Sequence, residues 1–145
     1  MSGERDLTKL LQHMTPLVHP EVFAFCHFSD FQLPPTLAPI ATFREAEGLT
    51  AITPISQARA LGVDYQFESR MVTLTVYSAL DAVGFLARIT TALATQGICC
   101  NVVSGYHHDH LFFPSNLLSD ALQVLESLTR DGSSKMSDQL DQQAG

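Results

Sequence analysis

Hydrophobic and polar positions follow two clear periods in the second half of the chain. Within residues 71–78, valine and leucine fall on one face and threonine and tyrosine on the other, which predicts a strand with one apolar side. An apolar stripe at helical spacing predicts a helix from about 82 to 96 that ends at Gly97. Further predicted elements are strands near 98–104 and 108–113 and a helix at about 116–129. The predicted order is β-α-β-β-α.

The first half repeats part of this order with shorter elements. Residues 5–13 predict a helix, and the apolar run 21–28 predicts a strand that is covered on both faces. Three prolines within 29–43 exclude regular structure and predict a surface loop. The elements that follow are two short strands joined through Gly48, a helix over 55–62 and a strand that enters at Tyr65.

These patterns predict an α+β protein of two related units. A β-α-β-β-α order with a right-handed crossover gives an antiparallel sheet with helices on one face, the ferredoxin-like plan. We place the first unit at 1–66 and the second at 67–130. Neither half is complete, so the halves either lend each other strands or form one joint sheet. Residues 131–145 contain few apolar positions and no period, which predicts a disordered tail.

Composition narrows the function. The net charge is -7, from 8 Lys and Arg against 15 Asp and Glu, so nucleic-acid binding is not expected. No segment approaches the ~20 apolar residues that cross a bilayer, and the first residues are charged, so we expect a cytoplasmic protein without membrane association. The chain has three cysteines, an odd number, and we see no export signal in it. We therefore interpret Cys26, Cys99 and Cys100 as reduced thiols that are buried as small apolar residues.

The start of the predicted helix at 82 is a candidate binding site. A helix N-terminus presents unpaired N–H groups and partial positive charge to an anion. We expect Asp81 to cap this helix and Gly84 to lie in its first turn, where glycine costs ~1 kcal/mol relative to alanine. Either a neighbouring backbone approaches too closely for a side chain, or a ligand does, with the Gly84, Phe85 and Leu86 amides as donors.

The segment DAVGFLARITTALATQGICCNVV resembles the signature of the ACT domain, a small regulatory module that typically binds amino acids. The matching positions are Asp81, Gly84, Leu86, Gly97, Ile98 and Asn101. Val83 stands where the family often has proline, and Asn101 follows Gly-Ile one or two positions later than usual. With FREAEGLTAITP and GYHHDHLFFP, the whole chain is similar to stand-alone proteins of two tandem ACT-like units.

The resemblance implies a β-α-β-β-α-β fold, no catalysis, no cofactor, and ligand binding near the helix start or between units. Carried over by position, it assigns to the ligand site Asp81, Val83, Gly84, Phe85, Leu86 and Asn101. Sites of this family are commonly completed by a second unit. We expect the turn of Gly48, Leu49 and Thr50 to supply that part.

A cluster of histidines allows a second interpretation. On a strand, His108 and His110 share a face roughly 7 Å apart, which is how a metal site can begin. A tetrahedral zinc ion needs a further ligand, and His13, His19 and His27 have no matching spacing. A polar or ligand-facing edge is therefore the favoured interpretation.

Two further patterns carry alternative chemistry. Ser78 or Ser104 beside a histidine could form a hydrolase site, but no nucleophile elbow accompanies either residue. Glu45 and Glu47 fall on one predicted strand face, which is typical of a solvated edge. As an alternative, one of these carboxylates receives the ammonium group of a bound amino acid.

We therefore expect a non-catalytic regulatory or sensor protein that binds a small ligand, an amino acid, and forms a homodimer through uncovered strand edges. A ligand-free interaction module, in which Gly84 only permits packing, is one alternative. A metal-dependent hydrolase that uses His108 and His110 is another.

Overall fold

The computed structural model describes residues 3–144, with side chains from residue 3 to residue 132. Its helices are α1 (Leu7–His13), α2 (Ile55–Leu61), α3 (Phe85–Thr95), η1 (Ser115–Leu117, 3-10) and α4 (Leu118–Ala144). Its strands are β1 (Pro16–Phe28), β2 (Ala41–Glu45), β3 (Gly48–Pro54), β4 (Tyr65–Leu74), β5 (Asn101–Ser104) and β6 (Asp109–Pro114). The chain divides into two compact units, unit 1 (1–18 and 72–145) and unit 2 (19–71).

Unit 2 is a sheet with strand order β2-β3-β1-β4 and one short helix. β3 is antiparallel to both its neighbours, with Phe28 opposite Leu49 on β1 and Glu45 opposite Gly48 on β2. Most residues of β3 are buried, and its backbone pairs with a strand on each side. Pro54 ends it, and α2 begins at the next residue.

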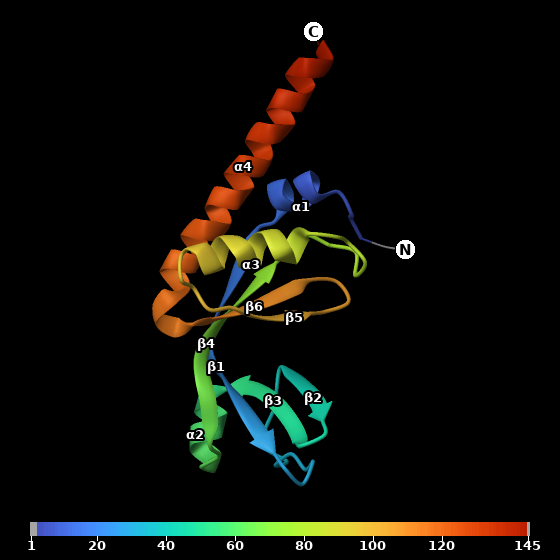
Figure 1. Ribbon diagram of the computed structural model, residues 1–145. Coiled ribbons are helices and arrows are strands. Elements are labelled where there is room, and N and C mark those ends of the chain that lie inside the picture. Colours follow the sequence, from blue (N-terminus) through green and yellow to red (C-terminus); the bar gives the residue numbers. More distant parts are fainter. Residues whose placement is uncertain (1–2, 145) are drawn as a thin grey trace. The chain divides into compact units, whose positions relative to one another are not determined.

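Unit 1 carries the larger core. β5 and β6 form an antiparallel pair, with Ser104 opposite Asp109, and β6 neighbours the end of β4. Helices α1, α3 and α4 pack their apolar faces on this sheet (Figure 1). The most deeply buried side chains of this core, from both the helices and the strands, are Leu10, Val72, Leu74, Ile89, Leu93, Leu111, Phe113, Ala121 and Leu125.

The predicted α+β class and the order β-α-β-β-α of the second half are confirmed by β4, α3, β5, β6 and α4. The bounds of the individual elements agree less well with the prediction than their order does. β4 covers Tyr65–Leu74, so it begins where we predicted a strand to enter and ends before residue 78, where we predicted the strand over 71–78 to end. The hairpin between β2 and β3 turns at residues 46 and 47, so Gly48 is the first residue of a strand and not the turn itself.

The interleaving that the sequence left open involves α1. This helix follows the N-terminus, yet it packs in unit 1 with elements of the second half. A Cβ on Gly132 of α4 would lie 3.1 Å from the backbone nitrogen of Gln12 on α1, so the two helices touch at that glycine. The boundary predicted at 66–67 stays a prediction.

The disordered tail predicted over 131–145 begins too early, because Asp131 and Gly132 continue α4 and Gly132 is buried. The backbone of α4 continues to Ala144, whereas we predicted no regular structure there; the side chains of residues 133–144, and residue 145, lie outside the described part of the chain. Among the described residues, no helix combines the length and the apolar character needed to span a bilayer.

The cysteines depart from the prediction in part. Cys26 on β1 is buried, as expected, but Cys99 is exposed and Cys100 is half-buried. Cys99 and Cys100 precede β5 and do not form part of that strand, so the alternation of a strand does not apply to them. Burial, assisted by the neighbouring Cys99 thiol, raises the pKa of Cys100 to about 12.

Candidate functional site

The residue that precedes helix α3 has no side chain. Gly84 is its N-cap and has a left-handed conformation, with φ 94° and ψ -10°. The first bond of the helix is donated by the Arg88 N–H to the Gly84 carbonyl, at 2.9 Å. The N–H groups of Phe85, Leu86 and Ala87 therefore have no acceptor within the helix, and no side chain caps them. These amides form a site of partial positive charge.

Asp81 does not cap this helix, contrary to our prediction. α3 starts at Phe85 instead of residue 82, three residues farther along the chain. Asp81 lies on the surface, where its carboxylate binds the Arg5 guanidinium, with 2.9 Å between Oδ1 and Nη2. The hydrogen bond from Arg5 lowers the pKa of Asp81. A long-range ion pair thus replaces the local cap that the sequence suggested.

The reason for glycine at position 84 is conformational. A Cβ there would meet only the Leu7 side chain, at 3.8 Å from its Cδ2, which is an ordinary contact. The packing explanation, a neighbouring backbone too close for a side chain, is therefore wrong. The positive φ is what favours glycine, because L-residues rarely adopt it.

A cavity of about 130 Å³ lies at this helix start. It brings together three predicted site residues, Gly84, Phe85 and Leu86, with one acidic side chain that we did not predict, Asp109. The other lining residues are Ser78, Ala79, Leu80, Ala82, Ala87 and Ser104. All of them belong to unit 1. The spot beside Gly84 is thus open to a small molecule.

Asp109 is held in place by two hydroxyl groups. Ser78 donates to its Oδ2 at 3.0 Å, and Ser104 donates to its Oδ1 at 2.7 Å. Ser104 reaches it because the β5–β6 register places the two residues opposite each other. Asp109 is only 6% exposed. The cavity therefore has a buried carboxyl group as well as the helix amides.

The segment that precedes α1 fixes another wall of the cavity. The Glu4 N–H donates to the Tyr77 carbonyl at 2.8 Å, and the Ala79 N–H donates to the Glu4 carbonyl at 2.9 Å. These bonds, with the ion pair from Arg5 to Asp81, hold the loop that carries Ala79. The wall is thereby anchored at both ends.

Two predicted site residues of this unit lie elsewhere. Val83 is 87% exposed and does not line the cavity. Asn101 is exposed at the first position of β5, opposite Phe112. It is three residues from Ser104, roughly 10 Å along the strand. Neither side chain lines the cavity at Gly84.

Gly48, Leu49 and Thr50 belong to unit 2, at the start of β3. A Cβ on Gly48 would lie 2.6 Å from the Phe28 carbonyl oxygen and 2.5 Å from His27 Nε2, so glycine is required there by close packing. Leu49 is buried, and Thr50 donates a hydrogen bond to Glu45.

Glu45 and Glu47 are placed differently from our prediction. Glu45 ends β2, whereas Glu47 lies in the turn, so they do not share a strand face. Both carboxylates, with Thr50, border a hollow of about 520 Å³ in unit 2. Asp64 lies there too.

The histidines do not form a metal site within the described residues, where no group of three or more His, Cys, Asp or Glu side chains could hold an ion. His110 Nδ1 lies 2.8 Å from Thr73 Oγ1. His108 precedes β6 and stacks at a tilt on His107, with 6.2 Å between ring centroids. The shared strand face predicted for His108 and His110 is therefore wrong.

The serines considered as nucleophiles have another role. The hydroxyl groups of both Ser78 and Ser104 donate to Asp109. Neither is positioned by a histidine base in the part of the chain that the structure describes. The geometry that activates a serine nucleophile is therefore not assembled around either of them.

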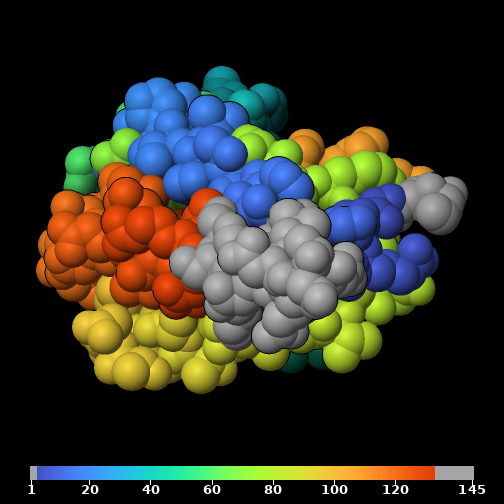
Figure 2. Space-filling view, turned by 90° about the horizontal axis from the view of Figure 1, so that it is seen from above, coloured from blue at the N-terminus to red at the C-terminus, as the bar shows by residue number. Residues whose placement is uncertain are grey.

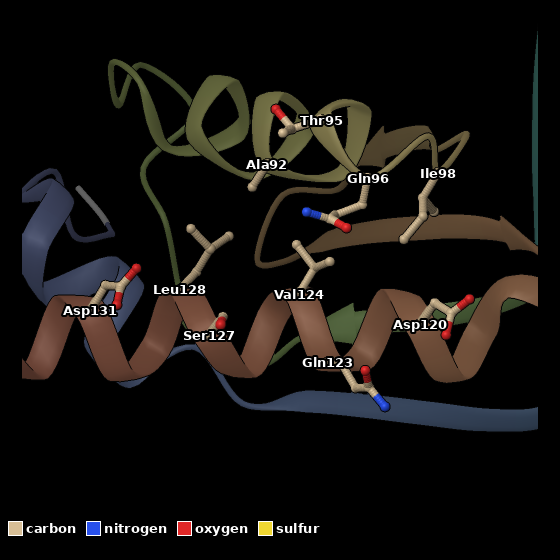
Figure 3. A pocket seen from close by; sticks show the side chains of 10 residues that line it. All are labelled: Ala92, Thr95, Gln96, Ile98, Asp120, Gln123, Val124, Ser127, Leu128 and Asp131. Atoms are coloured by element: carbon tan, nitrogen blue, oxygen red, sulfur yellow. The ribbon is translucent and has the colours of Figure 1, made fainter.

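A groove of about 460 Å³, larger than the cavity at Gly84, runs between α3 and α4 (Figure 3). Figure 2 shows the yellow surface of α3 beside the orange-red surface of α4. Thr95 and Gln96 place the groove at the C-terminal end of α3, and Asp120 and Asp131 of α4 border it. A helix C-terminus and two carboxylates repel an anion, so this groove suits a carboxylate ligand less well than the cavity at Gly84.

Comparison with known proteins gave a consistent result. Two sequence models described as ACT domain match the chain, one over residues 2–70 and the other over residues 66–127. No curated protein matches it. The residues that surround the cavity fall within the second match.

Solved structures resemble the chain over most of its length. A Vibrio cholerae protein of unknown function, described as a possible transport protein, is 39% identical with a TM-score of 0.75, over 85% of this chain and 95% of that one. An Agrobacterium tumefaciens protein is 18% identical with a TM-score of 0.68, over 81% and 90%. The regulatory subunit of aspartate kinase from Thermus thermophilus, in a ligand-free form, is 9% identical with a TM-score of 0.60, over 80% and 97%.

Proposed function

Because this chain belongs to the ACT domain family, with two ACT domains in tandem, we propose that it is a non-catalytic regulatory protein that binds an amino acid at the start of α3. Its fold is also that of a protein named as the regulatory subunit of an aspartate kinase. That likeness supports a regulatory role and leaves the ligand to be argued from the site.

The observation that carries the proposal is the open helix start. Three amides, of Phe85, Leu86 and Ala87, border a cavity and have no acceptor within α3. Left to themselves, such donors bind water or an anion, and a carboxylate fits the partial charge of a helix N-terminus. An amino acid supplies that carboxylate in a molecule small enough for the space.

In this proposal, ligand binding changes how the protein associates with a second copy of itself or with a partner. β2 and β5 are the outer strands of the strand order, and uncovered strand edges favour pairing with a second copy. A ligand shifts an equilibrium between assemblies only by its difference in affinity for them. We therefore propose a cytoplasmic homodimer whose stability, or whose affinity for a partner, depends on the bound amino acid.

The test is a change that blocks the carboxylate without weakening the helix. Ala87 lies in the first turn of α3 and is exposed, so Ala87→Glu adds a negative charge where a helix tolerates it well. In calorimetry against the standard amino acids, we expect the unchanged protein to bind one of them saturably. We expect Ala87→Glu to lower that affinity about tenfold or more while thermal stability stays equal or rises.

Ala94→Glu is the matched control, because it adds the same charge to an exposed position of the same helix, two turns away. We expect it to bind like the unchanged protein. Absence of binding to any amino acid would contradict the proposal and favour an interaction module. Equal binding by Ala87→Glu would place the ligand elsewhere.

A further inference from the structure

Asp109 is a buried acidic side chain without a cationic partner among the described side chains. More than nine-tenths of the residue is buried, and the two side chains that donate hydrogen bonds to it, Ser78 and Ser104, are neutral. The ion pairs among residues 3–132 are Arg5–Asp81, Arg59–Glu68 and Arg130–Glu126. None includes Asp109. Acidic side chains are almost never fully buried unless they are paired with a cation.

The cavity has opposite electrical character on two of its sides. Asp109 borders it from β6, and the free amides at the start of α3 border it as well. The hydrogen bonds of Asp109 go to serine hydroxyls, so the amides of Phe85, Leu86 and Ala87 are not used by it. A molecule that fits must offer a negative group to one side and a cation to the other.

We propose that Asp109 binds the ammonium group of a small amino acid whose carboxylate contacts the amides of α3. This rests on the proposed function and adds the class of ligand. A cavity of about 130 Å³ is close to the 150 Å³ of an engineered cavity that holds benzene. Glycine, alanine and serine fit within that space, whereas the side chains of aromatic and long basic amino acids would extend beyond it.

Asp109→Asn tests the ammonium contact, because asparagine has the same shape and can still bond both serines. The probes are L-alanine, propionate, which lacks the ammonium group, and ethylamine, which lacks the carboxylate. We expect the unchanged protein to bind L-alanine at least about tenfold more tightly than either analogue. Asp109→Asn should weaken L-alanine binding about 10- to 100-fold, whereas propionate binding should stay equal or become tighter, because it loses no ammonium contact and a carboxyl group that would repel an anion is removed.

The selective loss separates recognition from structure. Amide nitrogen NMR shifts of Phe85, Leu86 and Ala87 on addition of propionate should persist in Asp109→Asn, because the carboxylate contact remains. Asp64→Asn, which removes an exposed acid in unit 2, is the control and should bind L-alanine like the unchanged protein.

Three results would overturn the inference. One is L-alanine affinity retained in Asp109→Asn, and another is equal loss of L-alanine and propionate, which indicates a structural role. The third is that the unchanged protein binds none of glycine, L-alanine and L-serine. Binding of a larger amino acid, lost in Ala87→Glu, would then keep the proposed function while removing the size class assigned here.

Discussion

Replacing Gly48 with alanine tests whether this glycine serves packing or a ligand. The new Cβ would lie 2.6 Å from the Phe28 carbonyl oxygen and 2.5 Å from His27 Nε2. The histidine ring can move, although it would lose the hydrogen bond between Nε2 and the Glu47 carbonyl, 3.1 Å long. The Phe28 carbonyl cannot move freely, because β1 and β3 pair at this point. The strands must therefore separate locally.

Two costs add up at this position. φ is 150° at Gly48, and forcing an L-residue into such a conformation costs about 1–3 kcal/mol. Overpacking by one methyl group in a close-packed place costs about 1–3 kcal/mol more. We expect Gly48→Ala to lower the free energy of unfolding by about 2–5 kcal/mol, a large part of the usual total of about 5–15 kcal/mol. Circular dichroism in a urea titration measures it.

Gly62→Ala in the same unit separates the two costs. Gly62 also has a positive φ, of 65°, but a Cβ there would meet nothing within 4 Å. We expect a loss of about 1 kcal/mol or less, since alanine also restricts the unfolded chain. If Gly48→Ala were as stable as Gly62→Ala, the close approach of β1 would be refuted.

Amino-acid binding by the Gly48→Ala variant is a second measurement. The cavity at Gly84 is formed by residues of unit 1 alone, so Gly48→Ala should bind an amino acid normally at a temperature where it is folded. Binding that is lost from a folded Gly48→Ala protein would instead support the predicted part of the Gly48–Thr50 turn in the site.

Two further predictions concern titrating groups. Arg5→Gln should raise the pKa of Asp81 toward its ordinary value, because the guanidinium hydrogen bond that favours the carboxylate is removed; carboxyl carbon NMR across an acid titration measures it, and Arg130→Gln should leave Asp81 unchanged. Cys99 should react with iodoacetamide at pH 8 well before Cys100, since a pKa of about 12 keeps the Cys100 thiol protonated; peptide mass mapping follows both, and equal rates would contradict the burial of Cys100.

The sequence predicted the helix of α3 well and its start poorly. Phe85, Ile89 and Leu93 repeat at helical spacing, and all three are buried on one stripe. The start was misplaced because aspartate is a preferred N-cap residue and Asp81 shortly precedes the apolar stripe. In the structure Asp81 pairs with Arg5, 76 positions away, and no local pattern contains that contact.

Packing around glycine could not be read from the sequence either. Gly84 was weighed as a position of close approach, and Gly48 was assigned to a ligand site. The structure reverses the physical surroundings, with open space at Gly84 and backbone within 2.6 Å at Gly48. Both positions have a positive φ, which favours glycine at each of them. The free space beside each glycine depends instead on which distant segments pack there, and the local sequence does not show this.

Asp109 is the acidic residue of the site that the sequence did not predict. Charged residues are expected at the surface, and Ser78, which donates a hydrogen bond to this one, is 31 positions away. Local rules are broken twice in one place, by a helix start without a capping side chain and by a buried acid without a cation. Each departure lowers stability when taken alone. A ligand that carries both charges would relieve the two together, which is why departures of this kind concentrate at functional sites.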